Sequence, residues 1–225
     1  MRRVATLYRS SVGKKVLMAV TGAILFVWIL GHLEGNLKIF EGPDRYNAYA
    51  EGLRSFGAPF FGPSQFLWLV RVVLLFCVVV HMLSALQLTL RARAARPIAY
   101  QQAPHLEDTY ASRTMRWGGI ILLLYVIFHL MDLTWGMANP DFIPGNVYHN
   151  VVASFSRWPV AGVYVIAMAA LALHLYHGVV SALQTLGANH PKFNKLRRSI
   201  AAVIAVAIFV GFTSIPVAVL TGYLQ

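Results

Sequence analysis

The 225-residue chain is 58% hydrophobic and only 12% charged, with a net charge of +11. Soluble domains carry about 25% charged residues, so this composition argues against a soluble protein, and basic residues at the ends of apolar runs argue against nucleic-acid binding. The single cysteine, Cys77, excludes an intrachain disulfide and an iron–sulfur cluster held by this chain alone.

Five apolar runs are each long enough to cross a bilayer as a helix, which takes about 20 residues. Each must be helical, because lipid offers no hydrogen-bond partner to an open backbone. The sequence therefore predicts an all-α integral membrane protein with five transmembrane helices in one domain, residues 1–225. In chain order the predicted spans are Val16–Leu33, Phe66–Leu90, Trp117–Trp135, Val160–Leu186 and Ile200–Leu220.

The basic residues between the spans set the expected orientation. Residues 1–15, 91–116 and 187–199 carry five, five and four Lys and Arg residues, whereas the opposite side carries five in all. Because cytoplasmic loops hold the excess of Lys and Arg, the N-terminus is predicted to be cytoplasmic and the C-terminus outside. In the long outer loop, turn signals flank a predicted short surface helix, Arg45–Phe56.

Histidine is the ionisable residue that recurs within the spans. Ionisable side chains at membrane depth are costly and mark function by default. Four of the five spans carry histidine, and neutral imidazole is the usual axial ligand of haem iron. The pattern predicts a four-helix haem-binding bundle plus a fifth helix. The five residues are His32, His81, His129, His174 and His177.

Their depths, counted at 1.5 Å per residue from the polar residues that flank each span, fall on two levels. His32 and His129 lie nearer the outside, and His81 and His174 lie nearer the cytoplasm. The sequence therefore predicts two haems, each held between two histidines. His174 and His177 share a helix face, so spacing alone leaves both open as ligands, although depth favours His174.

Several short motifs along the whole chain add a resemblance. They are Ser11–Lys15 (SVGKK), Gly31–Leu37 (GHLEGNL), Asn47–Ala50 (NAYA), Val80–Met82 (VHM), Phe128–Leu130 (FHL) and His174–Gly187 (HLYHGVVSALQTLG). With these motifs the sequence resembles the single-chain, five-helix, di-haem cytochrome b anchor subunits of succinate dehydrogenases and fumarate reductases, the succinate:quinone oxidoreductases.

The resemblance implies ligands and cofactors. It places the haem ligands on His32 and His129 for the outer iron and on His81 and His174 for the inner iron. Glycines four and thirteen residues after the ligand fit His174 and not His177. The resemblance also implies two haems b as cofactors and a quinone as substrate, with menaquinone as the expected type. It implies a multi-pass protein of the bacterial-type cytoplasmic (inner) membrane.

The resemblance also implies partners and a division of labour. A flavoprotein subunit would carry out the succinate–fumarate chemistry, and an iron–sulfur subunit on the cytoplasmic side would relay electrons to this anchor. The chain has no flavin-binding motif and no cluster cysteines, so it would serve the enzyme as an electron-transfer subunit without acting on the dicarboxylate. Its direct surroundings would be membrane lipid and quinone, with no nucleic acid.

Quinone chemistry needs a proton donor or acceptor near the ring. Glu51 in the outer loop is the candidate for this catalytic role, and the alternative is a surface carboxylate beside Arg54. Asp132, three residues after His129, is a candidate hydrogen-bond acceptor beside the outer haem. The fourth span has no carboxylate, so the proton route that some family members have there is not expected.

Two basic residues are candidates to pair with inner-haem propionates, Arg113 and Arg116, with a role in topology as the alternative. Three other classes of protein remain open from the residues alone. They are a di-haem anchor of formate dehydrogenase or hydrogenase, a haem-free membrane protein that relays protons through histidine, and a soluble helical bundle.

Overall fold

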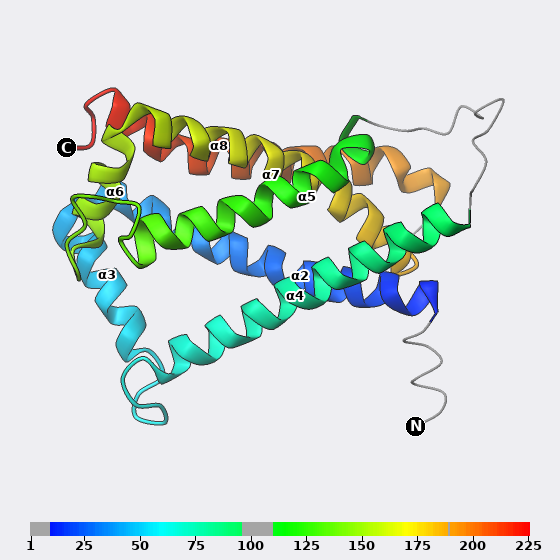
Figure 1. Cartoon of the computed structure of the whole chain (residues 1–225), viewed down its shortest axis with the longest axis horizontal. Coiled ribbons are helices and arrows are strands. Elements are labelled where there is room, and N and C mark those ends of the chain that lie inside the picture. The colour runs from blue at the N-terminus through cyan, green and yellow to red at the C-terminus, as the bar shows by residue number, and fades with distance from the viewer. Residues whose placement is uncertain (1–9, 96–109, 189) are drawn as a thin grey trace.

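The computed structural model describes residues 10–95, 110–188 and 190–225, and of residues 110–113 only the backbone. In these ranges the regular structure is entirely helical, and five long helices run along the long axis of the molecule (Figure 1). The predicted all-α class with five helices able to span a membrane is confirmed. Four of the basic residues counted in the sequence lie outside the described residues, namely Arg2, Arg3, Arg9 and Arg96. His105, between the second and third spans, also lies outside them.

All five long helices begin before their predicted spans, and the first two also end beyond them, whereas the third ends at His129, before the predicted Trp135. Hydropathy marks only the part of a helix that lies in hydrocarbon, whereas the helix itself continues into the polar interface. Their outward side chains are apolar and exposed, for example Val27, Leu75 and Val203, as lipid contact requires. The helices are α2 (Ser11–Leu37), α4 (Gln65–Ala94), α5 (Tyr110–His129), α7 (Trp158–Thr185) and α8 (Asn194–Leu220), which the short η3 (Pro191–Phe193) precedes.

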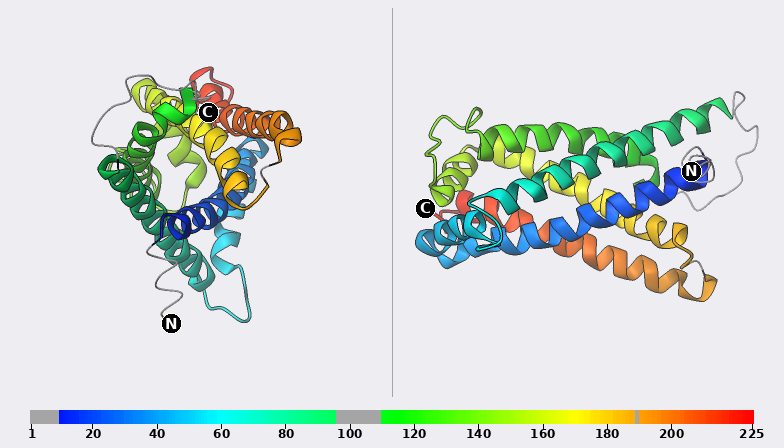
Figure 2. Two further views of the ribbon diagram at one scale, coloured as in Figure 1. Left: turned by 90° about the vertical axis from the view of Figure 1, so that its right-hand side faces the viewer. Right: turned by 90° about the horizontal axis from the view of Figure 1, so that it is seen from below.

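Helix α7 is the central element of the bundle. It packs against α5, α8 and α2, and α2 in turn packs against α4. Viewed along the bundle, α2, α4, α5 and α7 surround a common centre, and α8 lies outside them against α7 and α2 (Figure 2). The four helices that carry the predicted histidines are therefore the four that enclose the centre.

A layer of short helices closes the end of the bundle that holds the C-terminus. It consists of η1 (Lys38–Glu41), α3 (Pro43–Ser55) and α6 (Val147–Ser156). Helix α3 matches the predicted surface helix, whereas α6 was not predicted. The packed apolar core lies in this region. Buried side chains of these short helices form it together with side chains of α7, α8 and the C-terminus. Its members are Ile39, Tyr46, Tyr148, Val151, Phe155, Tyr164, Ile215, Ala218, Val219 and Leu224.

Asn47 joins the two short helices of this layer. Its amide nitrogen donates to the Asn146 side-chain oxygen at 3.1 Å, and its side-chain oxygen accepts from the backbone N–H of Tyr148 at 3.0 Å. Asn146 also caps the start of α6, because its side chain accepts from the backbone N–H of His149. These bonds fix α3 against α6 and make the layer a rigid lid on the bundle.

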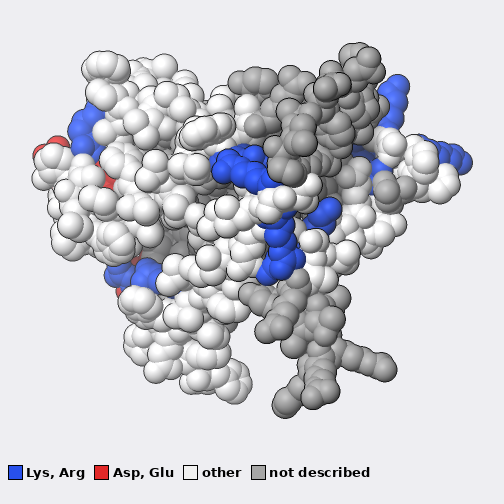
Figure 3. All heavy atoms as spheres, turned by 45° about the vertical axis from the view of Figure 1, so that its right-hand side comes forward, with Lys and Arg blue, Asp and Glu red and all other residues white. Residues whose placement is uncertain are grey.

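The charges divide between the two ends. All the described carboxylates lie toward the C-terminal end of the bundle, on or near α3, α6 and the ends of the helices they cover. On the face that Figure 3 shows, acidic atoms appear only toward that end, where basic atoms accompany them, and basic atoms alone appear toward the other end. Among the described residues, the end where α2 begins and α4 ends therefore carries basic side chains without acidic ones.

Candidate functional site

Four of the histidines form two facing pairs. The rings of His32 in α2 and His129 at the end of α5 have their centroids 5.9 Å apart, and those of His81 in α4 and His174 in α7 have theirs 6.2 Å apart. These are the pairs that the depth count predicted. All four rings are half-buried. Each pair joins two helices across the centre of the bundle.

The two pairs lie at different levels along the bundle. Tyr164 contacts His129, and His174 follows Tyr164 by ten residues on the same helix, which corresponds to about 15 Å. Helix α2 gives a similar spacing, because His81 contacts Met18 and Thr21, which precede His32 by fourteen and eleven residues. The His32–His129 pair is the one nearer the C-terminal end.

The distance within each pair suits two imidazoles on opposite sides of one metal ion. A metal–imidazole bond is about 2 Å long, and the nitrogen lies about 1 Å from the ring centroid, so the two centroids fall about 6 Å apart. Both observed distances agree with this value. Among the described residues no group of three or more His, Cys, Asp or Glu side chains could hold a metal ion. A pair of axial ligands therefore suits an iron whose other positions a porphyrin fills.

His81 is oriented by helix α2. Its Nδ1 lies 3.1 Å from the carbonyl oxygen of Met18 and 3.4 Å from the hydroxyl of Thr21. A carbonyl can only accept, so Nδ1 carries the proton and Nε2 keeps its lone pair for a metal. Gly22 allows this approach, because a Cβ there would stand 3.2 Å from Cε1 of His81. The sequence reasoning did not single out Gly22.

His174 has a buried nitrogen without a partner. Within the described part of the chain its Nδ1 forms no hydrogen bond, although the atom is inaccessible to water. Helix packing therefore does not fix the orientation of this ring through a hydrogen bond at Nδ1, in contrast to His81. The ring of His81 faces His174, whereas His177 has no such ring partner in the described residues. The geometry thus favours His174 over His177 as the member of the pair.

A cavity lies beside His174, between α5 and α7. Its volume is about 210 Å³, and Thr114, Trp117, Gly118 and Leu173 are among its lining residues. Pockets for small organic ligands are usually larger, about 300–1,000 Å³, so a porphyrin here requires side chains to move outward. Trp117 and Leu173 are exposed, so moving them breaks little packing.

The His32–His129 pair sits among aromatic rings. Trp28 stacks on His32 with a 5.6 Å centroid separation and 16° between the planes, and Phe212 of α8 lies 5.9 Å from the same ring. His129 contacts Tyr164, whose hydroxyl lies 3.3 Å from its Nδ1. These aromatic neighbours pack around the two imidazoles and hold them in place.

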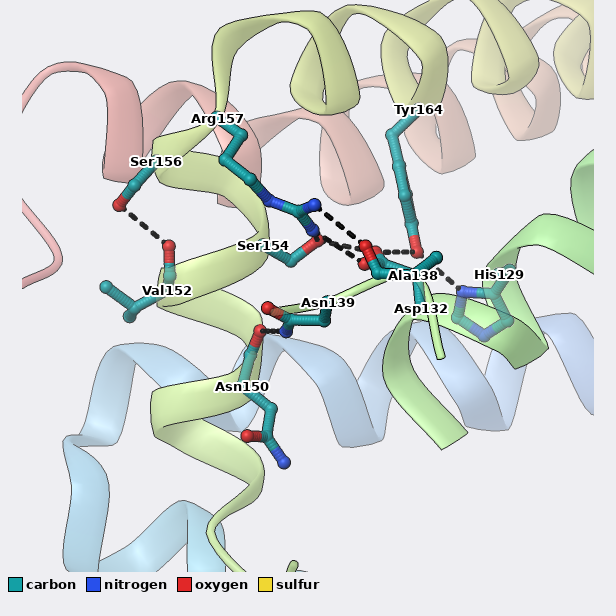
Figure 4. A network of polar contacts seen from close by, with 10 residues as sticks. All are labelled: His129, Asp132, Ala138, Asn139, Asn150, Val152, Ser154, Ser156, Arg157 and Tyr164. Carbon is teal, nitrogen blue, oxygen red and sulfur yellow. Dashed lines mark hydrogen bonds and ion pairs between the residues drawn. The ribbon is translucent and has the colours of Figure 1, made fainter. Parts of the chain in front are cut away.

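Asp132 is the centre of a buried polar network close to this pair (Figure 4). It is fully buried in the π-helical turn η2 (Leu130–Thr134) that directly follows His129. Its carboxylate accepts from Ser154 Oγ at 2.5 Å, from Arg157 Nη2 at 2.8 Å and from the Tyr164 hydroxyl at 2.9 Å. The guanidinium balances the carboxylate charge, as a buried ion requires. Three elements, η2, α6 and α7, meet at this one side chain.

The sequence reasoning found only part of this network. It named Asp132 as a hydrogen-bond acceptor. It counted Arg157 only as one of the five basic residues on the outer side, and it did not single out Tyr164. One signal was available, because a tyrosine hydroxyl within an apolar span must find a partner. The contacts themselves join residues 22 to 32 positions apart, so they produce no periodic pattern in the sequence from which they could be predicted.

The remaining candidates lie apart from the pairs. Glu51 is exposed on α3 and forms an ion pair with Arg54 at 2.9 Å, the arrangement that the alternative interpretation described. Tyr49, also on α3, lies close to Gly35 of α2, because a Cβ there would stand 2.6 Å from the Tyr49 hydroxyl. Arg116 is exposed. The side chain of Arg113 lies outside the described residues.

Comparison with known proteins gives one result. A family model described as succinate dehydrogenase/fumarate reductase transmembrane subunit matches residues 89–213, which is more than half of the chain. The matched part runs from the end of α4 into α8 and contains His129 and His174. No curated protein and no solved structure matches the chain.

Proposed function

The chain belongs to the family of succinate dehydrogenase/fumarate reductase transmembrane subunits, and on that premise we propose that it binds two haems b and passes electrons between an iron–sulfur subunit and membrane quinone. The outer haem would lie between His32 and His129, and the inner haem between His81 and His174. The multi-pass anchor would sit in a bacterial-type cytoplasmic membrane, with the flavoprotein and iron–sulfur subunits on the cytoplasmic side.

One observation carries the proposal. Two imidazole pairs, drawn from four different helices, face each other at separations near the 6 Å that one shared metal ion requires. Neither a proton relay nor a histidine kept for helix packing needs two imidazoles opposed across the bundle at this separation. The geometry therefore supports metal coordination over the haem-free alternative.

The residues of this chain have three tasks in electron transfer. The paired imidazoles hold an iron from both sides, and the hydrogen bond from His81 Nδ1 to Met18 keeps the other nitrogen of that ring free for it. The exposed apolar faces of the helices place the bundle in lipid. Bound haem b would supply one-electron redox chemistry, and the spacing of about 15 Å between the two levels sets the path across the membrane.

The charge distribution supports the side on which the partners dock. The end of the bundle where α2 begins carries Lys and Arg, while the described carboxylates lie toward the other end. By the bias of basic residues toward the cytoplasm, that end is cytoplasmic. The inner pair, His81 and His174, is then the nearer one to an iron–sulfur subunit docked there, and the outer pair is the more distant.

For the quinone step we propose Glu51 as the residue that transfers protons and menaquinone as the substrate. Helix α3, which carries Glu51, packs onto α2 one turn beyond His32, where Tyr49 lies over Gly35. Glu51 follows Tyr49 by two residues and is exposed, so it would exchange protons with water and with a quinone that approaches α3 from the surface. Its ion pair with Arg54 holds it on the surface of the lid.

Replacing the histidines one at a time tests the pairing. His32→Ala and His129→Ala should remove one and the same haem, and His81→Ala and His174→Ala the other, as judged by absorption spectra of the purified complex. His177→Ala is the matched control, because it lies on the same face of α7 and should retain both haems. Loss of the same haem in His32→Ala and His81→Ala would overturn the assignment.

A further inference from the structure

A hydrogen-bonded chain leads from the outer pair into the buried carboxylate. His129 Nδ1 lies 3.3 Å from the Tyr164 hydroxyl, and that hydroxyl lies 2.9 Å from Oδ2 of Asp132. Arg157 Nη2 and Ser154 Oγ hold the carboxylate from the other side at 2.8 and 2.5 Å. Figure 4 shows these five side chains converging from the end of α5, from η2, from α6, from Arg157 between α6 and α7, and from α7.

The direction of each bond follows from the donors present. The carboxylate can only accept, so the Tyr164 hydroxyl gives its single proton to Asp132. Its oxygen then has lone pairs left, and His129 donates Nδ1–H to it. This arrangement fixes the tautomer of His129 and leaves Nε2 as the nitrogen with a free lone pair.

We propose that Tyr164 is a positioning residue for His129 and that Asp132 acts through it, so that together they set the ring orientation and donor strength of this ligand and lower the potential of the outer haem. This inference rests on the proposed function, since it requires a haem at the His32–His129 pair. An acceptor on the far ring nitrogen makes an imidazole a stronger donor, which favours ferric iron.

The two pairs are held in different ways. The far nitrogen of His81 contacts a neutral backbone carbonyl, whereas that of His129 contacts a hydroxyl backed by a carboxylate. The carboxylate pulls on the tyrosine proton and so makes the tyrosine oxygen a stronger acceptor. The network is therefore specific to the outer pair, and disturbing it should leave the inner haem unchanged.

The Tyr164 ring stays in place without its hydroxyl. It packs against Phe155 at 4.8 Å and against Tyr125 at 5.2 Å between ring centroids, and it is buried. Tyr164→Phe therefore removes the hydrogen bond and keeps the packing. Tyr125→Phe is the matched control, because this ring lies 5.8 Å from His129 while the Nδ1 bond goes to Tyr164.

The test is a redox titration of both haems in the purified complex, followed by absorbance, with the outer haem identified as the one that His32→Ala removes. Tyr164→Phe should raise the outer potential by about 59 mV, which is a tenfold change for a one-electron couple, and should leave the inner potential unchanged. Tyr125→Phe should change neither. An unchanged outer potential in Tyr164→Phe would overturn this inference and leave the proposed function standing.

A second variant covers the case in which Tyr164→Phe loses its haems. Asp132→Asn combined with Arg157→Gln removes the buried carboxylate together with its half-buried partner and avoids leaving either charge unpaired. It should raise the outer potential by less than about 59 mV, because Tyr164 keeps a weaker acceptor. Equal shifts of both haems would assign the network a purely structural role, whereas wild-type complex with no haem at the outer pair would refute the proposed function instead.

Discussion

The imidazole planes of His32 and His129 are inclined at 86° to one another. The stacking of Trp28 on His32 and the contact of Tyr164 with His129 hold this crossed arrangement. The rings of His81 and His174 are inclined at 52°, so the two pairs offer an iron different ligand fields.

This difference predicts distinct electron paramagnetic resonance signals. Crossed axial imidazoles leave two iron d orbitals nearly equal in energy, which makes the low-spin ferric signal strongly anisotropic. The outer haem should therefore give a larger maximum g value than the inner haem. Spectra of the oxidised complex, with the inner signal removed in His81→Ala, provide the measurement. A larger maximum g value for the inner haem would contradict the ring geometry.

Gly22 offers a test that leaves every ligand in place. A Cβ at this position would stand 3.2 Å from Cε1 of His81, so the bulkier Gly22→Val should displace the ring from α2 and from its contact with Met18. We expect the inner haem to be lost or spectrally altered and the outer haem to be retained. Gly31→Val, on the same helix, meets nothing within 4 Å of its Cβ and serves as the control. Loss of the outer haem alone in Gly22→Val would contradict the placement of the pairs.

Membrane physics made most of the fold predictable. A helix must satisfy its backbone internally in lipid, so long apolar runs alone define the five spans. The polar residues that flank the spans give the starting point of each count, and the count placed His32 level with His129 and His81 level with His174. Defining the spans needs only local sequence. Comparing the depths of the histidines needs only one coordinate, the position along the membrane normal.

What could not be predicted depends on packing between distant residues. Helix α6 is too short for a span and is held by Asn47 from another helix. The π-helical turn after His129 and the bonds from Arg157 and Tyr164 to Asp132 arise only when η2, α6 and α7 meet. No periodicity records such contacts, so residues that orient a ligand are harder to find in a sequence than the ligand itself.

Glu51→Gln should slow quinone turnover several-fold, because an amide can neither accept nor donate the required proton. The haem spectrum should stay as in wild type, since Glu51 is exposed and its ion pair is with Arg54. Succinate-dependent quinone reduction by the complex is the measurement, and reduction of a soluble dye by the flavoprotein side is the internal control. Unchanged quinone turnover would remove Glu51 from the mechanism.

The orientation is testable because the chain has a single cysteine, Cys77, which is buried. In a Cys77→Ser background, Tyr223→Cys places an exposed thiol near the C-terminus, and Lys195→Cys places one at the opposite end. A membrane-impermeant thiol reagent should label Tyr223→Cys in intact cells and Lys195→Cys only after lysis. The reverse pattern would invert the predicted topology.

The most direct test of the proposed function is a count of haem b per copy of this chain, by pyridine haemochrome assay on the detergent-purified complex. Two imidazole pairs with metal-bridging separations predict two haems b per chain. One haem would mean that one pair is not a haem site. A complex of intact subunits with no haem would contradict the electron-transfer function.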